Sequence, residues 1–274
     1  MSRSKNKHGL AWLLTLFLTV LLVIILSSVG LNSTVFSANF TSNVLTQPRN
    51  VDYITKQINH QIDQVQQKHH LPITLPAHTL QPSDVKPIIK TTVHRLYNGY
   101  PEIFNAQQIL DIFLNRLQKL NQSNIINFNN KNLPLIWQQA QAYVAKIISE
   151  QLNTSAVQEQ VINFSNLRLT TRMIMIGSIL FFLLFLMLLL LQQQQEQRWL
   201  HYLGISLLTA TFILAIVIWS IIEKVTYANL PFARPLIANL CTQALNKNIC
   251  LLVITAIGGI VLLLIDHFRQ HQHN

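Results

Sequence analysis

Five histidines between residues 32 and 171 are the side chains of this 274-residue sequence that could best support metal chemistry: His60, His69, His70, His78 and His94. On a helix, His60 and Asp63 would lie one turn apart, and with His69 and His70 they could bind zinc or another divalent ion. The sequence has no H-E-x-x-H motif and no cysteine in this segment, which favours ordinary surface histidines. We therefore expect neither a metal site nor a bound cofactor.

Motifs for nucleophilic or acid–base catalysis are missing from the same segment. It contains no G-x-S-x-G, and its carboxylates are scattered without an evident pair. Gly99 is its one glycine, which excludes a glycine-rich phosphate loop. We therefore expect a non-enzymatic protein, with a hydrolase of unrecognised site as the enzymatic alternative.

Aromatic residues gather around the turn signal Asn98-Gly99. Tyr97, Tyr100 and Phe104, together with Trp137, could present a patch that binds a protein or glycan partner. Alternatively, these side chains lie beneath the turn and close the core, which is the more common arrangement. We name the four residues as the candidate partner patch.

The composition places these residues in a membrane protein. Hydrophobic residues make up 50% of the chain and charged residues 11%, against roughly a quarter charged in soluble domains. Four apolar runs predict transmembrane helices over residues 10–31, 172–191, 203–222 and 249–265. A cleaved signal peptide is the rival interpretation of the first run, but a signal core spans only about 7 to 15 residues.

Basic residues near the N-terminus (Arg3, Lys5 and Lys7) predict a cytoplasmic start under the positive-inside rule. The expected topology is cytoplasmic for 1–9, the 192–202 hairpin and the 266–274 tail, and extracytoplasmic for the 32–171 domain and the 223–248 loop. Residues 234–247 of that loop show helical apolar spacing and predict an amphipathic helix on the outer membrane surface or against the domain.

The domain inserted between the first two spans should be helical, because sheets with tight turns need more than one glycine. Apolar spacing predicts helices over 51–69, from a cap at Ser83 to Asn98-Gly99, from a cap at Asn105 to about 120, and over 134–152. A capping box at Ser155 and Gln158 predicts a last helix, and no glycine or proline stops it before the second span. The fold class is therefore all-α.

Charge and cysteine patterns limit the partners. The net charge of +10 is spread along the chain, so no dense basic block indicates nucleic-acid binding. The spans carry almost no charge, which argues against transport by this chain alone. Cys241 and Cys250 either pair across the second outer loop or are unrelated small residues. The expected partners are the lipid bilayer and other membrane proteins.

A bacterial envelope is the expected setting, because the 32–171 domain holds no cysteine and must rely on an apolar core. The predicted function is a non-enzymatic membrane protein whose outer domain binds or senses an extracytoplasmic partner. An accessory subunit of a transporter or channel is the alternative.

Overall fold

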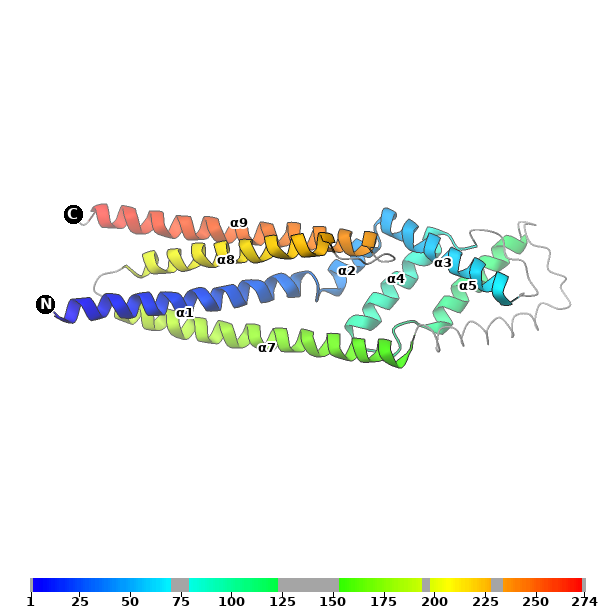
Figure 1. Ribbon diagram of the computed structural model, residues 1–274, viewed down its shortest axis with the longest axis horizontal. Coiled ribbons are helices and arrows are strands. Elements are labelled where there is room, and N and C mark those ends of the chain that lie inside the picture. Colours follow the sequence, from blue (N-terminus) through cyan, green and yellow to red (C-terminus); the bar gives the residue numbers. More distant parts are fainter. Residues whose placement is uncertain (1, 70–78, 123–152, 194–197, 228–233, 273–274) are drawn as a thin grey trace. The chain divides into compact units, whose positions relative to one another are not determined.

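The computed structural model describes residues 2–69, 79–122, 153–193, 198–227 and 234–272 (Figure 1). Within these ranges the chain forms only helices, which confirms the all-α prediction. They are α1 (Ser2–Ser33), α2 (Ala38–Leu45), α3 (Pro48–His69), α4 (Pro82–Tyr97), α5 (Ala106–Gln122), α7 (Ser155–Gln192), α8 (Trp199–Tyr227) and α9 (Arg234–Gln272).

Two compact units make up the chain. The membrane unit combines Met1–Phe36 with Arg168–Asn274, and the helical unit is Ser37–Leu167. Helix α7 contributes to both, since its single helix crosses the boundary between Leu167 and Arg168. This continuity agrees with the absence of a helix breaker between Ser155 and Gly177.

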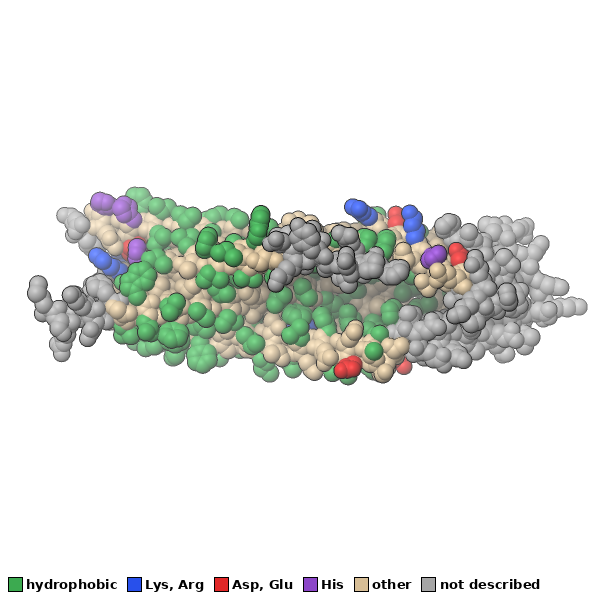
Figure 2. All heavy atoms as spheres, viewed as in Figure 1, with side chains coloured by type: hydrophobic (Ala, Val, Ile, Leu, Met, Phe, Trp, Pro, Cys, Tyr) green, Lys and Arg blue, Asp and Glu red, His purple; other side chains and the backbone are tan. Residues whose placement is uncertain are grey.

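Four helices in the described chain are long and apolar enough to cross a membrane, which confirms the predicted number of spans. The candidate spans are Gly9–Ser33, Ser155–Gln192, Trp199–Ile221 and Pro235–His271. Hydrophobic side chains cover much of the outer face of this unit (Figure 2), and Phe181, Trp219 and Phe268 are among those exposed. Lipid is the solvent that suits such a surface, so the protein is a multi-pass membrane protein.

Inside the membrane unit, α1 packs against the ends of α7 and α8. Its core holds Ala11, Leu14, Leu18, Leu189 and Tyr202. The rings of Phe17 and Phe185 stack beside this core with centroids 5.2 Å apart. One apolar face of α1 therefore packs on the other helices, and the apolar residues on its remaining surface are exposed and suited to lipid.

Helices α8 and α9 approach each other at two glycines. A Cβ on Gly204 would lie 2.9 Å from Leu263 Cδ2 and 3.0 Å from the Gly259 carbonyl oxygen, and a Cβ on Gly259 would lie 3.0 Å from Leu208 Cγ. Small residues allow such close backbone contact between membrane helices. Gly258, by contrast, has open space at its Cβ position.

Helix α9 differs from the expected separate surface helix and short span. Residues 234–247 are helical as predicted, but they continue without interruption into the span. No proline or glycine occurs between Pro235 and Gly258 to end the helix. At about 1.5 Å per residue, α9 is roughly 58 Å long, about twice the hydrocarbon thickness, so much of it must lie beyond the hydrocarbon core.

The two cysteines lie on this one helix and are both free thiols. Cys241 and Cys250 are nine positions apart, so the helical rise separates their Cα atoms by roughly 13 Å, well beyond the reach of a disulfide. Of the two possibilities left open by the sequence, a disulfide or two unrelated cysteines, the structure therefore supports two cysteines that are not paired with each other.

The helical unit has its own apolar core, formed around α3 and α4. Its buried members are Val51, Leu80, Val85, Ile89, Val93 and Tyr97. The helical spacing of the apolar residues in both segments produces this face. Helix α2 was not predicted, although Ser37 marks its start: the Phe40 amide donates to Ser37 Oγ at 3.2 Å.

Two helix starts differ from the predicted caps. Helix α4 begins after Gln81 rather than Ser83, because Pro82 suits the first helical position and the Gln81 amide donates to Asp84 Oδ2 at 2.9 Å. Helix α7 uses the Thr154 hydroxyl, which accepts from the Val157 amide at 3.3 Å, instead of Ser155. The cap at Asn105 is confirmed by its bond from the Gln108 amide. The predicted helix over 134–152 lies outside the described residues.

Candidate functional site

The turn after α4 positions the predicted aromatic patch. Gly99 has φ of +70°, the Gly99 amide donates to the Leu96 carbonyl, and the Tyr100 amide donates to the Arg95 carbonyl at 3.1 Å. These bonds form a Schellman motif, which requires a left-handed residue after the helix and therefore favours glycine. The motif sends Tyr97 and Tyr100 in different directions.

Tyr97 points into the helical unit and is only 7% exposed. Its hydroxyl hydrogen-bonds the Thr41 hydroxyl at 2.6 Å, and its ring meets Phe164 edge-on with centroids 5.2 Å apart. A buried tyrosine with a satisfied hydroxyl fixes the orientation of neighbouring elements. Tyr97 thus links α4 to α2 and α7 beneath the turn.

Tyr100 is 46% exposed and carries a cation on its ring. The Arg95 guanidinium carbon lies 5.0 Å from the ring centroid, while Arg95 Nε donates to the Glu102 carbonyl at 2.7 Å. The two contacts hold the arginine in place over the aromatic face. The turn therefore presents a positioned cation and an aromatic ring together at the surface.

Phe104 is half-buried, and its backbone is clamped by Asn153. The Phe104 amide donates to Asn153 Oδ1 at 3.1 Å, and Asn153 Nδ2 donates to the Phe104 carbonyl at 3.0 Å. Trp137 lies outside the described residues. The structure thus places Tyr97, Tyr100 and Phe104 in three different surroundings, and the four-residue patch stays a prediction.

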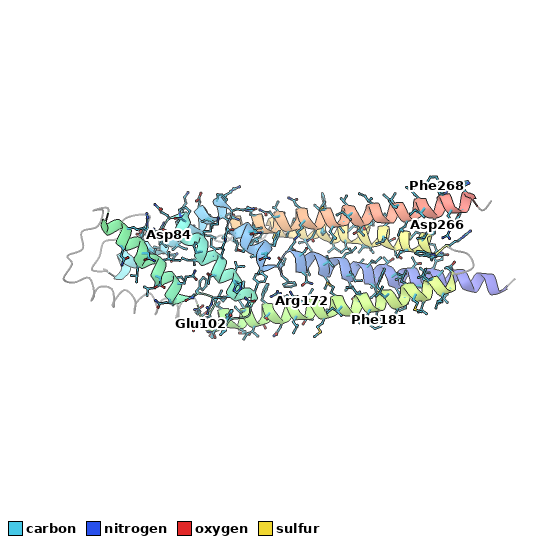
Figure 3. The ribbon with its side chains drawn as sticks, turned by 180° about the vertical axis from the view of Figure 1, so that it is seen from behind. Asp84, Glu102, Arg172, Phe181, Asp266 and Phe268 are labelled. Atoms are coloured by element: carbon cyan, nitrogen blue, oxygen red, sulfur yellow. The ribbon has the colours of Figure 1, made fainter. Side chains whose placement is uncertain are left out.

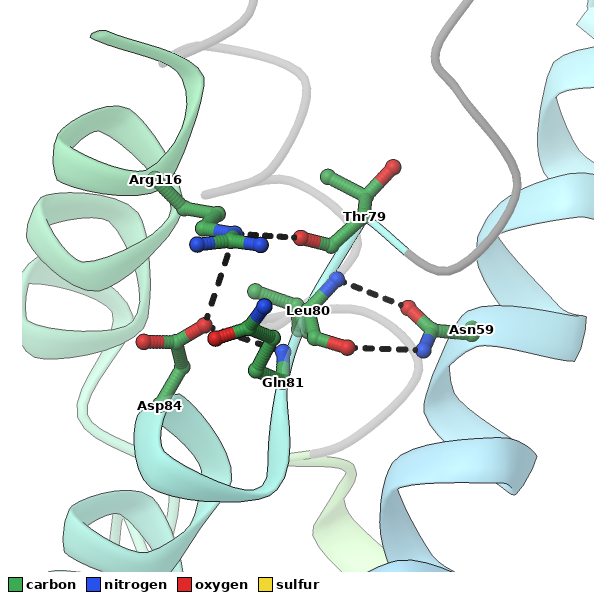
Figure 4. A network of polar contacts seen from close by, with 6 residues as sticks. All are labelled: Asn59, Thr79, Leu80, Gln81, Asp84 and Arg116. Atoms are coloured by element: carbon green, nitrogen blue, oxygen red, sulfur yellow. Dashed lines mark hydrogen bonds and ion pairs between the residues drawn. The ribbon is translucent and has the colours of Figure 1, made fainter. Parts of the chain in front are cut away.

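A polar network that the sequence did not predict holds the segment before α4 (Figure 4). The Asn59 side chain bonds both backbone groups of Leu80, accepting from its amide and donating to its carbonyl, each at 3.0 Å. Arg116 Nε donates to the Thr79 carbonyl at 3.1 Å and lies 3.8 Å from Asp84 Oδ2. The network joins α3, α4 and α5 through the backbone of residues 79–81.

The histidines considered as metal ligands have other neighbours where their side chains are described. His60 Nε2 lies 2.9 Å from Gln64 Nε2, and the His94 ring contacts the Asn98 side chain at 3.1 Å. Across the described part of the chain, His, Cys, Asp and Glu form no group of three or more that could hold a metal ion. His70 and His78 lie outside the described residues.

Hydroxyl groups in the membrane unit bond to helix backbones. Thr15 donates to the Ala11 carbonyl at 2.7 Å and Thr19 to the Thr15 carbonyl at 2.9 Å. The fully buried Ser206 on α8 is 3.2 Å from the Thr15 carbonyl on α1 and 3.0 Å from the Tyr202 carbonyl. Such bonds satisfy polar groups within the bundle and join its helices.

One carboxylate lies at the C-terminal end of α9, where Figure 3 labels it. Asp266 is 3% exposed; its Oδ2 accepts from Gln270 Nε2 at 2.9 Å and lies 3.5 Å from His201 Nδ1 on α8. A buried acid needs such partners because desolvation penalises the charge. The contact ties the end of α9 to the beginning of α8.

The opposite end of the membrane unit also has polar links. Lys247 Nζ on α9 donates to the Ser33 carbonyl at 2.7 Å, and Asn32 Nδ2 approaches Met175 Sδ on α7 at 3.9 Å. A cation at a helix C-terminus satisfies a free carbonyl and suits the helix dipole. These contacts hold the C-terminal end of α1 beside Met175 of α7 and beside Lys247 of α9.

Most of these polar residues join segments distant in sequence, so local patterns did not reveal them. Asn59 and Leu80 are 21 residues apart, and Ser206 and Thr15 are 191 apart. The signals that could have pointed to the network around Leu80 were polar residues within apolar stretches: Asn59 between Ile58 and Ile62, and Arg116 beside Leu117. Comparison with protein-family models, curated proteins and solved structures found no match.

Proposed function

We propose that this protein is a non-enzymatic envelope protein whose helical unit, outside the cytoplasm, binds or senses a partner, while the membrane unit anchors it. The observation that carries the proposal is the surface pair of Arg95 and Tyr100, with the cation 5.0 Å from the ring centroid. Arginine and tyrosine are enriched among the residues that contribute most to protein interfaces. Their positions are fixed before binding, which lowers the entropic cost of association.

The surroundings of the pair support a recognition role. Tyr97, directly before the turn, is anchored by Thr41 and Phe164, and the Schellman bonds fix the backbone that carries Tyr100. A site on a rigid turn keeps its geometry without a ligand. The partner that fits is a protein or glycan surface with a carboxylate for Arg95 and an apolar or sugar face for Tyr100.

The membrane unit supports an anchoring role. Its described hydroxyl groups on Thr15, Thr19 and Ser206 bond to helix backbones, and Gly204 and Gly259 bring α8 and α9 together. These are features of helix packing. The basic N-terminus supports the proposed orientation, with both termini in the cytoplasm and residues 32–171 outside.

Site-specific photocrosslinking in living cells tests the proposal. Tyr100 is replaced by p-benzoylphenylalanine, which keeps an aromatic ring at the turn, and the matched control carries the same residue at Ile162, an exposed position of the same unit. We expect a discrete adduct from position 100 that is absent from position 162 and is lost when R95A is added. No adduct, or equal adducts from both positions, would contradict the proposal.

The identity of the adduct separates the alternatives. A transporter or channel subunit crosslinked at position 100 would favour an accessory role in such a complex. Purified full-length protein that hydrolysed peptidoglycan, lipid or peptide substrates, and lost this activity in H60A or H94A with its helical content intact, would instead establish the hydrolase alternative.

A further inference from the structure

Two histidines occupy one face of α9 near its end. His267 and His271 are four residues apart, their ring centroids are 4.8 Å apart with an interplanar angle of 81°, and both residues are exposed. A spacing of four places side chains on the same helical face. Figure 2 shows histidine side chains gathered at this end of the membrane unit.

The ring separation matches that of two imidazoles on one metal ion. With a metal–nitrogen distance of about 2.0–2.1 Å and a nitrogen roughly 1.1 Å from its ring centre, ligands at 90° put the centroids about 4.5 Å apart, and tetrahedral ligands about 5.2 Å apart. The observed 4.8 Å lies between these values. The two rings are therefore close enough for one nitrogen of each to reach a shared ion once their side-chain torsions adjust.

The helix that carries the pair is held by other contacts. Asp266 contacts His201 on α8 at 3.5 Å and accepts from Gln270 at 2.9 Å, so the last turns of α9 are fixed to the bundle. Arg269 lies two residues from each histidine, and that spacing places it on the opposite side of the helix. Arg269 therefore does not place its positive charge beside a cation bound by the two histidines.

We propose that His267 and His271 form a bidentate site for a first-row divalent transition metal such as Cu²⁺ or Zn²⁺, with water completing the coordination. Imidazole nitrogen suits these ions, whereas Mg²⁺ and Ca²⁺ require oxygen ligands. Two histidines at this spacing on one helical face are also the zinc-binding half of known metalloprotease motifs. The site is independent of the proposed function of the helical unit.

Copper titration of the untagged full-length protein in detergent tests the site, in a C241S/C250S background that removes competing thiols. We expect one tight Cu²⁺ per chain, with an electron paramagnetic resonance signal of two equatorial nitrogens, displaced by excess Zn²⁺. H267A should weaken binding at least ten-fold, since even outer-shell partners of metal ligands change affinity by about 10- to 100-fold.

The matched control is the double variant H271Q/Q272H, which keeps the number of histidines but moves one to a spacing of five, away from the face of His267. Its tight site and its two-nitrogen signal should be lost, while circular dichroism matches the parent protein. Unchanged affinity in both H267A and H271Q/Q272H, or a one-nitrogen signal in the parent, would overturn the proposal.

Discussion

Replacing Gly204 with alanine should destabilise the membrane unit, although alanine is the better helix former. The new Cβ would meet Leu263 carbons at 2.9 Å and the Gly259 carbonyl oxygen at 3.0 Å. The leucine can change its rotamer, but the backbone oxygen moves only if α8 and α9 separate. The contact therefore forces a shift of the helix pair.

The magnitude follows from two opposing effects. Alanine gains about 1 kcal/mol over glycine in a helix interior, whereas overpacking a close contact costs about 1–3 kcal/mol. We expect G204A to lower the free energy of unfolding by a net amount of up to about 2 kcal/mol, the upper end of the difference between the two effects. G258A is the control, because Gly258 has no atom within 4 Å of its Cβ position, and it should leave stability unchanged or raise it by up to about 1 kcal/mol.

The assay is unfolding of the purified protein in mixed micelles by increasing the mole fraction of SDS, followed by circular dichroism. The G204A curve should shift to lower SDS and the G258A curve should not. Equal shifts for the two variants, or stabilisation by G204A, would refute the close approach of α8 and α9 at Gly204.

Three further outcomes are expected. N59A leaves the Leu80 amide and carbonyl without their 3.0 Å partner. It should lower the free energy of unfolding, measured by thermal unfolding, by about 2–4 kcal/mol, because each unsatisfied group costs about 1–3 kcal/mol and partial rehydration recovers some of this. An effect no larger than that of N98A, at an exposed position, would contradict the clamp of Leu80 by Asn59. Y97F removes the 2.6 Å bond to Thr41 and should cost about 1 kcal/mol, while Y100F should cost nothing measurable; equal effects would count against the buried position of Tyr97. Cys241 and Cys250 should both alkylate without prior reduction, as intact mass spectrometry would show, and an internal disulfide in the folded protein would be incompatible with a continuous α9.

The spans and most helices of the described chain were predictable because their signals are local. The apolar run after His8, the Asn98-Gly99 stop and the Asn105 cap each lie within a few residues of the feature they specify. The continuity of α7 was equally visible, since no glycine or proline interrupts residues 155–176. Where ending a helix would require a glycine or proline and none is present, the local sequence is enough to predict that the helix continues.

Other features depended on contacts between distant segments. Sequence alone could not distinguish Gly259, which faces α8, from its neighbour Gly258, which faces open space. Helix α4 is capped by Gln81 and not by Ser83 because Pro82 occupies the first helical position and the Asp84 carboxylate accepts from the Gln81 amide. The pair His267 and His271 was visible as a spacing of four, but its importance depends on α9 continuing through the predicted tail.

The central claim, that the helical unit lies outside the cytoplasm, is tested most directly by labelling single cysteines on intact cells with a membrane-impermeant maleimide. In a C241S/C250S background, S83C reports on an exposed position of the helical unit, and Q194C reports on the segment between α7 and α8. Both should label after permeabilisation, which is the control for reactivity. We predict labelling of S83C but not Q194C on intact cells, and labelling of Q194C but not S83C would contradict the account.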